Sequence, residues 1–170
     1  MDVIVDRCAG LDIGKRKVQA CVRGPDGSGG RTSEVRTFDT FTGDLEDMAR
    51  WLGSEGVTEV TMEATGPYWW PVWDVLEEAG FELMLVNSKQ VKFLSGRKTD
   101  VGDAAWLAEL LEHVLLRGSF VPPEQVRRLR DLTRYRKRLI QTHTSEGQRI
   151  QKTLENAGIK LDSRTPDPLR

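Results

Sequence analysis

The chain has 170 residues, of which 38% are hydrophobic and 30% charged, and its formal net charge is −1. This length suffices for one well-packed domain and little more. No apolar run approaches the roughly 18 residues of a membrane span, and the first residues lack the pattern of a secretory signal. We therefore expect a cytoplasmic protein with no membrane partner.

Charge is divided unevenly along the chain. Residues 1–116 contain 12 Lys and Arg against 20 Asp and Glu, whereas residues 117–170 contain 13 against 6. Such asymmetry indicates a segment that binds a polyanion, attached to a domain of another kind. A solvated basic helix face would give the same composition, so charge alone leaves both interpretations open.

The first 41 residues have the pattern of an antiparallel meander. Apolar runs at 7–11 and 17–23 flank a tight turn, a Gly-rich loop follows, and residues 34–41 alternate as a strand does. Cys8 and Cys21 lie in the first two runs without a CxxC spacing, and we expect them to be reduced core residues.

Helices and strands then alternate. Strands are expected at 57–64 and 81–86, and helices from Thr42 to the Gly53–Gly56 segment, at 67–79, at 88–94, and from Thr99 or Asp100 to about Leu116. The order β-β-β-α-β-α-β-α is that of the ribonuclease-H-like α/β fold, a mixed sheet with helices on both faces.

Pro122 and Pro123 end this domain, which we place at residues 1–121. A second segment, 122–160, is predicted to be a basic helix from Glu124 to about Asn156, and residues 161–170 a disordered end or linker. Apolar residues recur along the helix at three- or four-residue steps, a coiled-coil-like stripe whose second half is polar.

Four carboxylates fall at expected strand ends or in the first turn of a helix: Asp12, Glu63, Asp100 and Asp103. The last two, three residues apart, would share a helix face with Cβ atoms about 5–6 Å apart. Each acid alone also fits an ordinary turn, a solvent-facing position or a helix start. Together, acids that converge repel one another unless a cation lies between them, and Mg²⁺ takes oxygen ligands. We therefore predict that these four acids bind Mg²⁺, with Mn²⁺ as a substitute, for chemistry on a nucleic-acid backbone.

Aromatic and basic side chains surround these acids. Tyr68, Trp69, Trp70 and Trp73 follow Glu63 closely and could stack on bases, but packing is the commoner role and is favoured for Trp73. Cations near the acids are candidates for phosphate contacts, namely Lys15, Lys89, Lys92, Arg97 and Lys98. The basic helix adds Arg127, Arg128, Arg130, Arg134, Arg136, Lys137 and Arg138.

Four motifs, in this order, resemble a known family: Leu-Asp-Ile-Gly-Lys, Glu-Ala-Thr-Gly-Pro-Tyr, Val-Asn-Ser-Lys-Gln-Val-Lys and Lys-Thr-Asp-x-x-Asp-Ala. Over about residues 5–155 the chain is similar to the N-terminal DEDD domain of the one-ten insertion-sequence family of bridge-RNA-guided transposases, whose catalytic domain resembles RuvC. The resemblance implies Mg²⁺ held by Asp12, Glu63, Asp100 and Asp103. It also implies donor and target DNA, a structured guide RNA, and a homo-oligomer assembled through the long helix.

Members of that family are longer and carry a second, C-terminal domain with a nucleophilic serine. The resemblance thus implies that this chain holds the acidic half of a composite active site and lacks the serine domain. Two other hypotheses stay open. The chain could be a non-catalytic nucleic-acid-binding and dimerisation fragment, or an actin-like nucleotide phosphotransferase, which shares the strand order but requires a second Asp-x-Gly segment.

Overall fold

The computed structural model describes residues 3–64, 66–93 and 102–160. The chain divides into two units, Met1–Val121 and Pro122–Arg170, which are described separately below.

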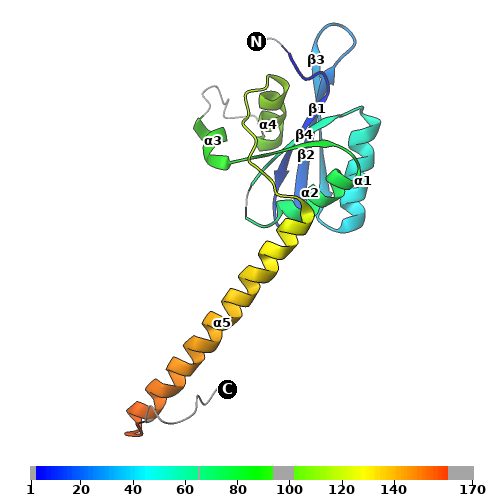
Figure 1. Ribbon diagram of the computed structural model, residues 1–170. Helices are drawn as coiled ribbons and strands as arrows, with labels where there is room; N and C mark the ends of the chain where they lie inside the picture. Colours follow the sequence, from blue (N-terminus) through cyan, green and yellow to red (C-terminus); the bar gives the residue numbers. More distant parts are fainter. Residues whose placement is uncertain (1–2, 65, 94–101, 161–170) are drawn as a thin grey trace. The chain divides into compact units, whose positions relative to one another are not determined.

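A five-stranded mixed sheet with the order β3-β2-β1-β4-β5 forms the centre of the first unit (Figure 1). The strands β1 (Cys8–Ile13), β2 (Lys17–Pro25) and β3 (Arg31–Asp39) form the antiparallel meander. The strands β4 (Glu59–Glu63) and β5 (Glu82–Val86) continue the sheet parallel to β1. This arrangement confirms the predicted ribonuclease-H-like fold.

Helices cover both faces of the sheet (Figure 1). On one face lie α1 (Thr42–Ser54) and α2 (Trp69–Glu78), and on the other lies α4 (Asp103–Glu112), which packs mainly on β1 and β2. The short helix α3 (Ser88–Phe93) follows β5. Helices therefore follow strands in the predicted order.

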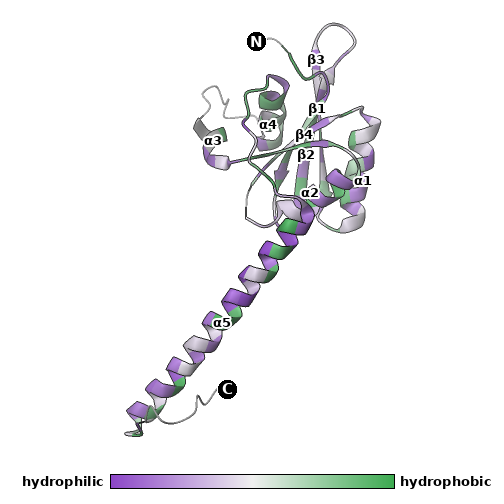
Figure 2. Ribbon diagram, viewed as in Figure 1, coloured by the Kyte–Doolittle hydropathy of each residue, from purple (hydrophilic) through white to green (hydrophobic). Residues whose placement is uncertain are grey.

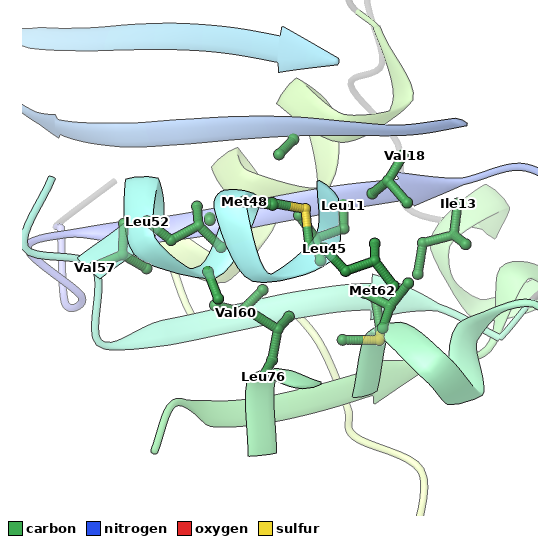
Figure 3. Close-up of a cluster of buried hydrophobic side chains, with 14 of the residues drawn as sticks. Leu11, Ile13, Val18, Leu45, Met48, Leu52, Val57, Val60, Met62 and Leu76 are labelled. Carbon is green, nitrogen blue, oxygen red and sulfur yellow. The ribbon is translucent and has the colours of Figure 1, made fainter. Parts of the chain in front are cut away.

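The larger hydrophobic core lies between the sheet and the helices α1 and α2. Side chains alternate between the two faces of a strand, so Leu11 of β1 and Met62 of β4 both point to this side. They meet Leu45 and Met48 of α1 (Figure 3). Trp73 of α2 belongs to the same core, so the packing role predicted for it is confirmed.

Small residues line the opposite face, where α4 approaches the sheet. A Cβ atom on Gly10 would overlap the Ala104 carbonyl oxygen and the Ala108 amide nitrogen of α4, so only glycine fits there. The buried Cys8 Sγ donates to the Ala108 carbonyl oxygen at 3.4 Å. Cys8 and Cys21 are both buried and free, as predicted, and burial raises their thiol pKa to about 12 and about 11.

The structure differs from the prediction at two element boundaries that matter for the acids. β1 runs on to Ile13, so Asp12 lies within the strand rather than after it. α4 begins at Asp103, because Gly102 is extended with φ −59° and ψ 151°. The prediction of one helix starting at Thr99 or Asp100 is therefore wrong at its start. The predicted end at Leu116 is also wrong, since α4 ends at Glu112 and Val114 has a φ of 53°.

The second unit is dominated by α5 (Glu124–Asn156), whose bounds match the predicted basic helix. Figure 2 shows isolated apolar positions along an otherwise polar helix. The predicted disordered end, residues 161–170, lies outside the described residues. Within the described parts of both units, no helix combines the length and hydropathy needed to cross a bilayer.

Candidate metal centre

Two of the four predicted acids lie side by side at the carboxyl ends of neighbouring parallel strands. Leu11 of β1 is in register with Met62 of β4, so the next residues along, Asp12 and Glu63, are neighbours across the two strands. Both alternate with residues of the α1–α2 core, so both side chains belong to the opposite face, where Gly10 meets α4. The sheet register thus places two carboxylates together.

The third acid, Asp103, comes to the same place from α4. It is the first residue of that helix and is exposed. A Cβ atom on the preceding Gly102 would lie 3.5 Å from Gln19 Oε1, and Gln19 is paired with Asp12 in the β1–β2 ladder. The start of α4 therefore lies over the strand that carries Asp12.

The pKa of Asp12 is influenced by both of the other acids. Its pKa is raised above 3.8, first by burial, then by the negative charges of Asp103 and Glu63. Separate elements β1, β4 and α4 therefore bring three carboxylates within mutual influence. Asp100, the fourth predicted acid, lies outside the described residues.

The chemistry of these donors fits a hard divalent cation. Residues 3–64, 66–93 and 102–160 contain no complete group of three His, Cys, Asp or Glu side chains close enough to hold a metal ion. Mg²⁺, however, is usually bound through one or two carboxylates, with water and substrate phosphates completing the shell. Burial and then repulsion from neighbouring carboxylates raise the pKa of Asp12, and a bound cation relieves that repulsion.

A buried ion-pair cluster fixes the far end of α4, and sequence reasoning did not find it. The carboxylate of Glu112 is buried and pairs with Arg23 of β2 and with Arg31 of β3, the latter at 2.6 Å. The amides of Ile4 and Val5 donate to the Glu112 carbonyl oxygen at 3.1 and 3.2 Å. These contacts join residues far apart in the sequence, so no local pattern could have indicated them.

The aromatic cluster after Glu63 divides into packed and exposed members. Trp69 contacts Trp73 edge-on at 5.8 Å between ring centroids and Trp70 at 5.4 Å, and both Trp69 and Trp73 pack in the core beneath α2. Tyr68 is 40% exposed. Packing therefore accounts for Trp69 and Trp73, whereas Tyr68 contributes little to the core.

Of the predicted cations of the first unit, three belong to the described part of the chain and two lie outside the described residues. Lys15 and Lys89 are exposed, Lys15 in the turn between β1 and β2 and Lys89 in α3. Lys92 belongs to α3, and Arg97 and Lys98 lie outside the described residues. The turn also carries Arg16 and Lys17, which sequence reasoning passed over although the run Lys15-Arg16-Lys17 closely follows Asp12.

On α5, most of the predicted cations are exposed: Arg128, Arg130, Arg134, Arg136, Lys137 and Arg138. Arg127 differs, because its guanidinium donates to the Pro122 carbonyl oxygen at 3.0 Å, and Arg128 pairs with Glu124. These contacts tie two cations to the start of the helix, whereas the others lie further along it.

Comparison with known proteins gives one match that spans most of the chain. The family model for DEDD transposases of the IS110 type, described as "Transposase", matches residues 9–159. No protein of curated function matches the chain.

Among solved structures, Thermus thermophilus RuvC is similar at 14% identity and a TM-score of 0.47, covering 66% of this chain and 99% of RuvC. A fowlpox virus Holliday junction resolvase is similar at 14% identity and a TM-score of 0.37, covering 48% of this chain and 60% of the resolvase. The fowlpox virus resolvase in complex with Holliday junction DNA is similar at 13% identity and a TM-score of 0.37, covering 55% and 65%.

Proposed function

Because this chain belongs to the IS110 family of DEDD transposases, we propose that it carries out metal-dependent cleavage and exchange of DNA strands during transposition. The observation that carries the proposal is the parallel register of β1 and β4, which makes Asp12 and Glu63 neighbours. The pKa of Asp12, raised first by burial and then by the charges of Asp103 and Glu63, supports it. Three elements that are separate in the sequence bring acids within electrostatic range of one another, which packing alone does not require.

We assign the metal to Asp12, Glu63, Asp103 and, from the family motif, Asp100. Mg²⁺, or Mn²⁺ in its place, would polarise a phosphodiester and stabilise the charge that develops on its oxygens. The strand residues Asp12 and Glu63 are held by the sheet, so their positions are fixed before any ligand binds. Asp103 is carried by α4, whose position depends on the close contact at Gly10.

We also propose that α5 binds nucleic acid, including a structured guide RNA, alongside donor and target DNA. The helix contains nine Lys and Arg against four Asp and Glu, a balance that favours contact with phosphates. The family resemblance supplies the guide RNA and a serine-bearing domain that would complete the active site.

The catalytic assignment is tested by calorimetric titration with Mn²⁺ in the presence of a short branched DNA. Phosphates are included because they complete the shell of a cation held by few carboxylates. We expect the parent chain to bind Mn²⁺ and Asp12→Asn to lose that binding. Asp47→Asn is the matched control, because Asp47 is an exposed acid of α1 that pairs with Arg50.

Other outcomes of the same titration discriminate between hypotheses. Equal Mn²⁺ affinity in the parent chain and Asp12→Asn contradicts the metal assignment. Nucleic-acid binding without Mn²⁺ binding, unchanged when all four acids are neutralised, identifies a non-catalytic binding unit that acts through α5. The actin-like phosphotransferase hypothesis draws no support from the family match, and ATP binding at millimolar concentration would restore it.

The apolar stripe of α5 leads us to propose a homo-oligomer formed through this helix. Leu129, Leu132 and Leu139 are 61%, 66% and 51% exposed, which is unusual for a regular stripe of leucines. Leu132→Glu combined with Leu139→Glu should convert the oligomer to monomer, because two carboxylates in an apolar seam repel and lose hydration. Sedimentation equilibrium measures the change.

The control for this pair is Gln141→Glu combined with Gln148→Glu. Gln141 and Gln148 have the same seven-residue spacing but lie on the opposite side of a 3.6-residue helix. We expect this control to keep the parent's mass. A parent chain that sediments as a monomer, or a control that dissociates equally, contradicts assembly through the leucine stripe.

A further inference from the structure

A turn beside the metal centre carries cations and an aromatic side chain that the proposed function does not use. We propose that Lys15, Arg16, Lys17 and Phe41, named here the turn surface, bind an unpaired DNA strand adjacent to the reacting phosphate. This inference rests on the proposed function, since it takes the carboxylates as the place where DNA reacts.

The backbone of the turn surface is fixed. Lys15, Arg16 and Lys17 are all exposed. Lys15 and Arg16 lie between β1, which carries Asp12, and β2, and Lys17 is the first residue of β2. The Gly14 amide donates to the Lys17 carbonyl oxygen at 2.9 Å and closes the turn. Two further bonds, from the Thr40 amide to the Arg16 carbonyl oxygen and from Thr40 Oγ1 to the Lys15 carbonyl oxygen, are both 3.2 Å long. Three cations are thus held on an ordered backbone, close in sequence to Asp12.

Phe41 adjoins this turn through Thr40 and is 76% exposed. It occupies the N-cap position of α1, where Ser, Thr, Asp or Asn is preferred because the side chain can accept from a backbone amide. Phe41 makes no such bond. Phe41 thus departs from the residue preference of the N-cap position, and it neither caps the helix nor packs in the core. A departure of this kind without a structural gain is typical of a functional position.

The combination of these groups selects the ligand. Proteins that bind single-stranded nucleic acid join a cationic track for phosphates to aromatic rings on which bases stack. Among the carboxylates near the turn, Asp12 precedes it in β1 and Asp39 is paired with Lys17 in the β2–β3 ladder. In a duplex the bases are stacked inside the helix, so Phe41 can reach only an unpaired base. Cleavage and exchange of strands exposes such bases next to the carboxylates, which favours DNA over RNA here.

The experiment measures binding of a short fluorescein-labelled single-stranded DNA by anisotropy, in EDTA, between about 50 and 200 mM salt. The full chain is used with Arg134, Arg136, Lys137 and Arg138 changed to Gln, so that α5 does not dominate binding. Arg16→Gln combined with Lys17→Gln should reduce the salt slope by about 1.4, as expected for two lost phosphate contacts on a single strand. Phe41→Ala should weaken binding about tenfold with an unchanged slope, and Phe41→Trp should restore it.

Two matched controls test whether any exposed residue of the same type has this effect. Arg50→Gln removes an exposed cation of α1, and Phe120→Ala removes a phenylalanine that is 83% exposed and follows the bridge between Val86 and Gly118 at the β5 edge. Both should bind as their parent does. The inference fails if the turn variants bind like the parent or if the controls lose as much affinity. Tighter binding of an RNA of the same sequence overturns the assignment to DNA.

These outcomes are separable from those of the metal test, because no metal is present in EDTA. Normal DNA binding by the turn variants, together with loss of Mn²⁺ binding in Asp12→Asn, removes this inference and leaves the proposed function. Weakened DNA binding by the turn variants, together with unchanged Mn²⁺ binding in Asp12→Asn, leaves the turn surface and removes the metal assignment.

Discussion

Asp12→Asn is expected to abolish metal-dependent DNA cleavage while making the metal-free chain more stable. Removal of groups that merely orient metal ligands costs about 10- to 100-fold in affinity or activity, so loss of a ligand should cost at least about 100-fold. The same change removes a carboxylate whose charged form is disfavoured by burial and by two neighbouring acids. Activity and stability should therefore change in opposite directions, which loss of a purely structural residue does not produce.

The direction of the pKa shift of Asp12 determines whether Asp12→Asn raises or lowers the stability of the metal-free chain. The pKa of Asp12 is raised above 3.8 in the folded chain, so the folded state holds this proton more tightly than the unfolded state does. The stability that this provides is fully present below about pH 3.8 and is lost as pH rises through the raised pKa. Asn carries no titrating proton, so Asp12→Asn should gain stability over the parent across this range.

Urea unfolding of both chains in EDTA, at several pH values from 3.5 to about 7, measures the difference. Asp12 is the only group changed, so other titrating acids cancel in the comparison. Cleavage is assayed on branched DNA with Mg²⁺, using this chain together with the serine-bearing domain that the proposed function calls for. A variant that cleaves normally, or that is less stable than the parent at pH 7, contradicts the assignment of Asp12 to a metal centre.

Much of the fold was predictable because the spacing of apolar residues along each helix and strand can be read from neighbouring residues in the sequence. Helical and strand patterns gave the element order, and the buried strand before Asp12 and the strand ending at Glu63 were visible in the sequence. The element order then indicated the ribonuclease-H-like fold, a mixed sheet with helices on both faces. Residue types at strand ends led to the prediction of a metal site, because an acid at such a position does not serve packing.

The sequence did not determine how the acids approach one another. The register that sets Leu11 beside Met62, and with it Asp12 beside Glu63, is a long-range property of two parallel strands. The start of α4 was misplaced because Thr99 and Asp100 resemble a helix cap as well as Asp103 does, and only the extended backbone of Gly102 decides. The partners of the buried Glu112, the half-buried Arg23 and Arg31, come from a different part of the chain.

The contact between Gly10 and α4 is the point at which packing controls the site, and Gly10→Ala should show this. The added Cβ would overlap two backbone atoms of α4 and lie 2.9 Å from Leu107 Cβ. Backbone atoms of a buried helix cannot rotate away as a flexible side chain does, so α4 must move off the sheet. Overpacking costs about 1–3 kcal/mol and occasionally more, and we expect at least about 3 kcal/mol here.

The displacement of α4 should reach the proposed metal centre, because Asp103 is its first residue. Gly10→Ala is therefore expected to weaken Mn²⁺ binding under conditions in which the chain is still folded, as judged by circular dichroism. Gly53→Ala in α1 is the matched control: a Cβ there has no neighbour within 4 Å, and alanine should stabilise the helix by up to about 1 kcal/mol. Equal stability of Gly10→Ala and the parent would mean that α4 does not press against β1. Loss of stability with intact Mn²⁺ affinity would mean that Asp103 does not depend on the position of its helix.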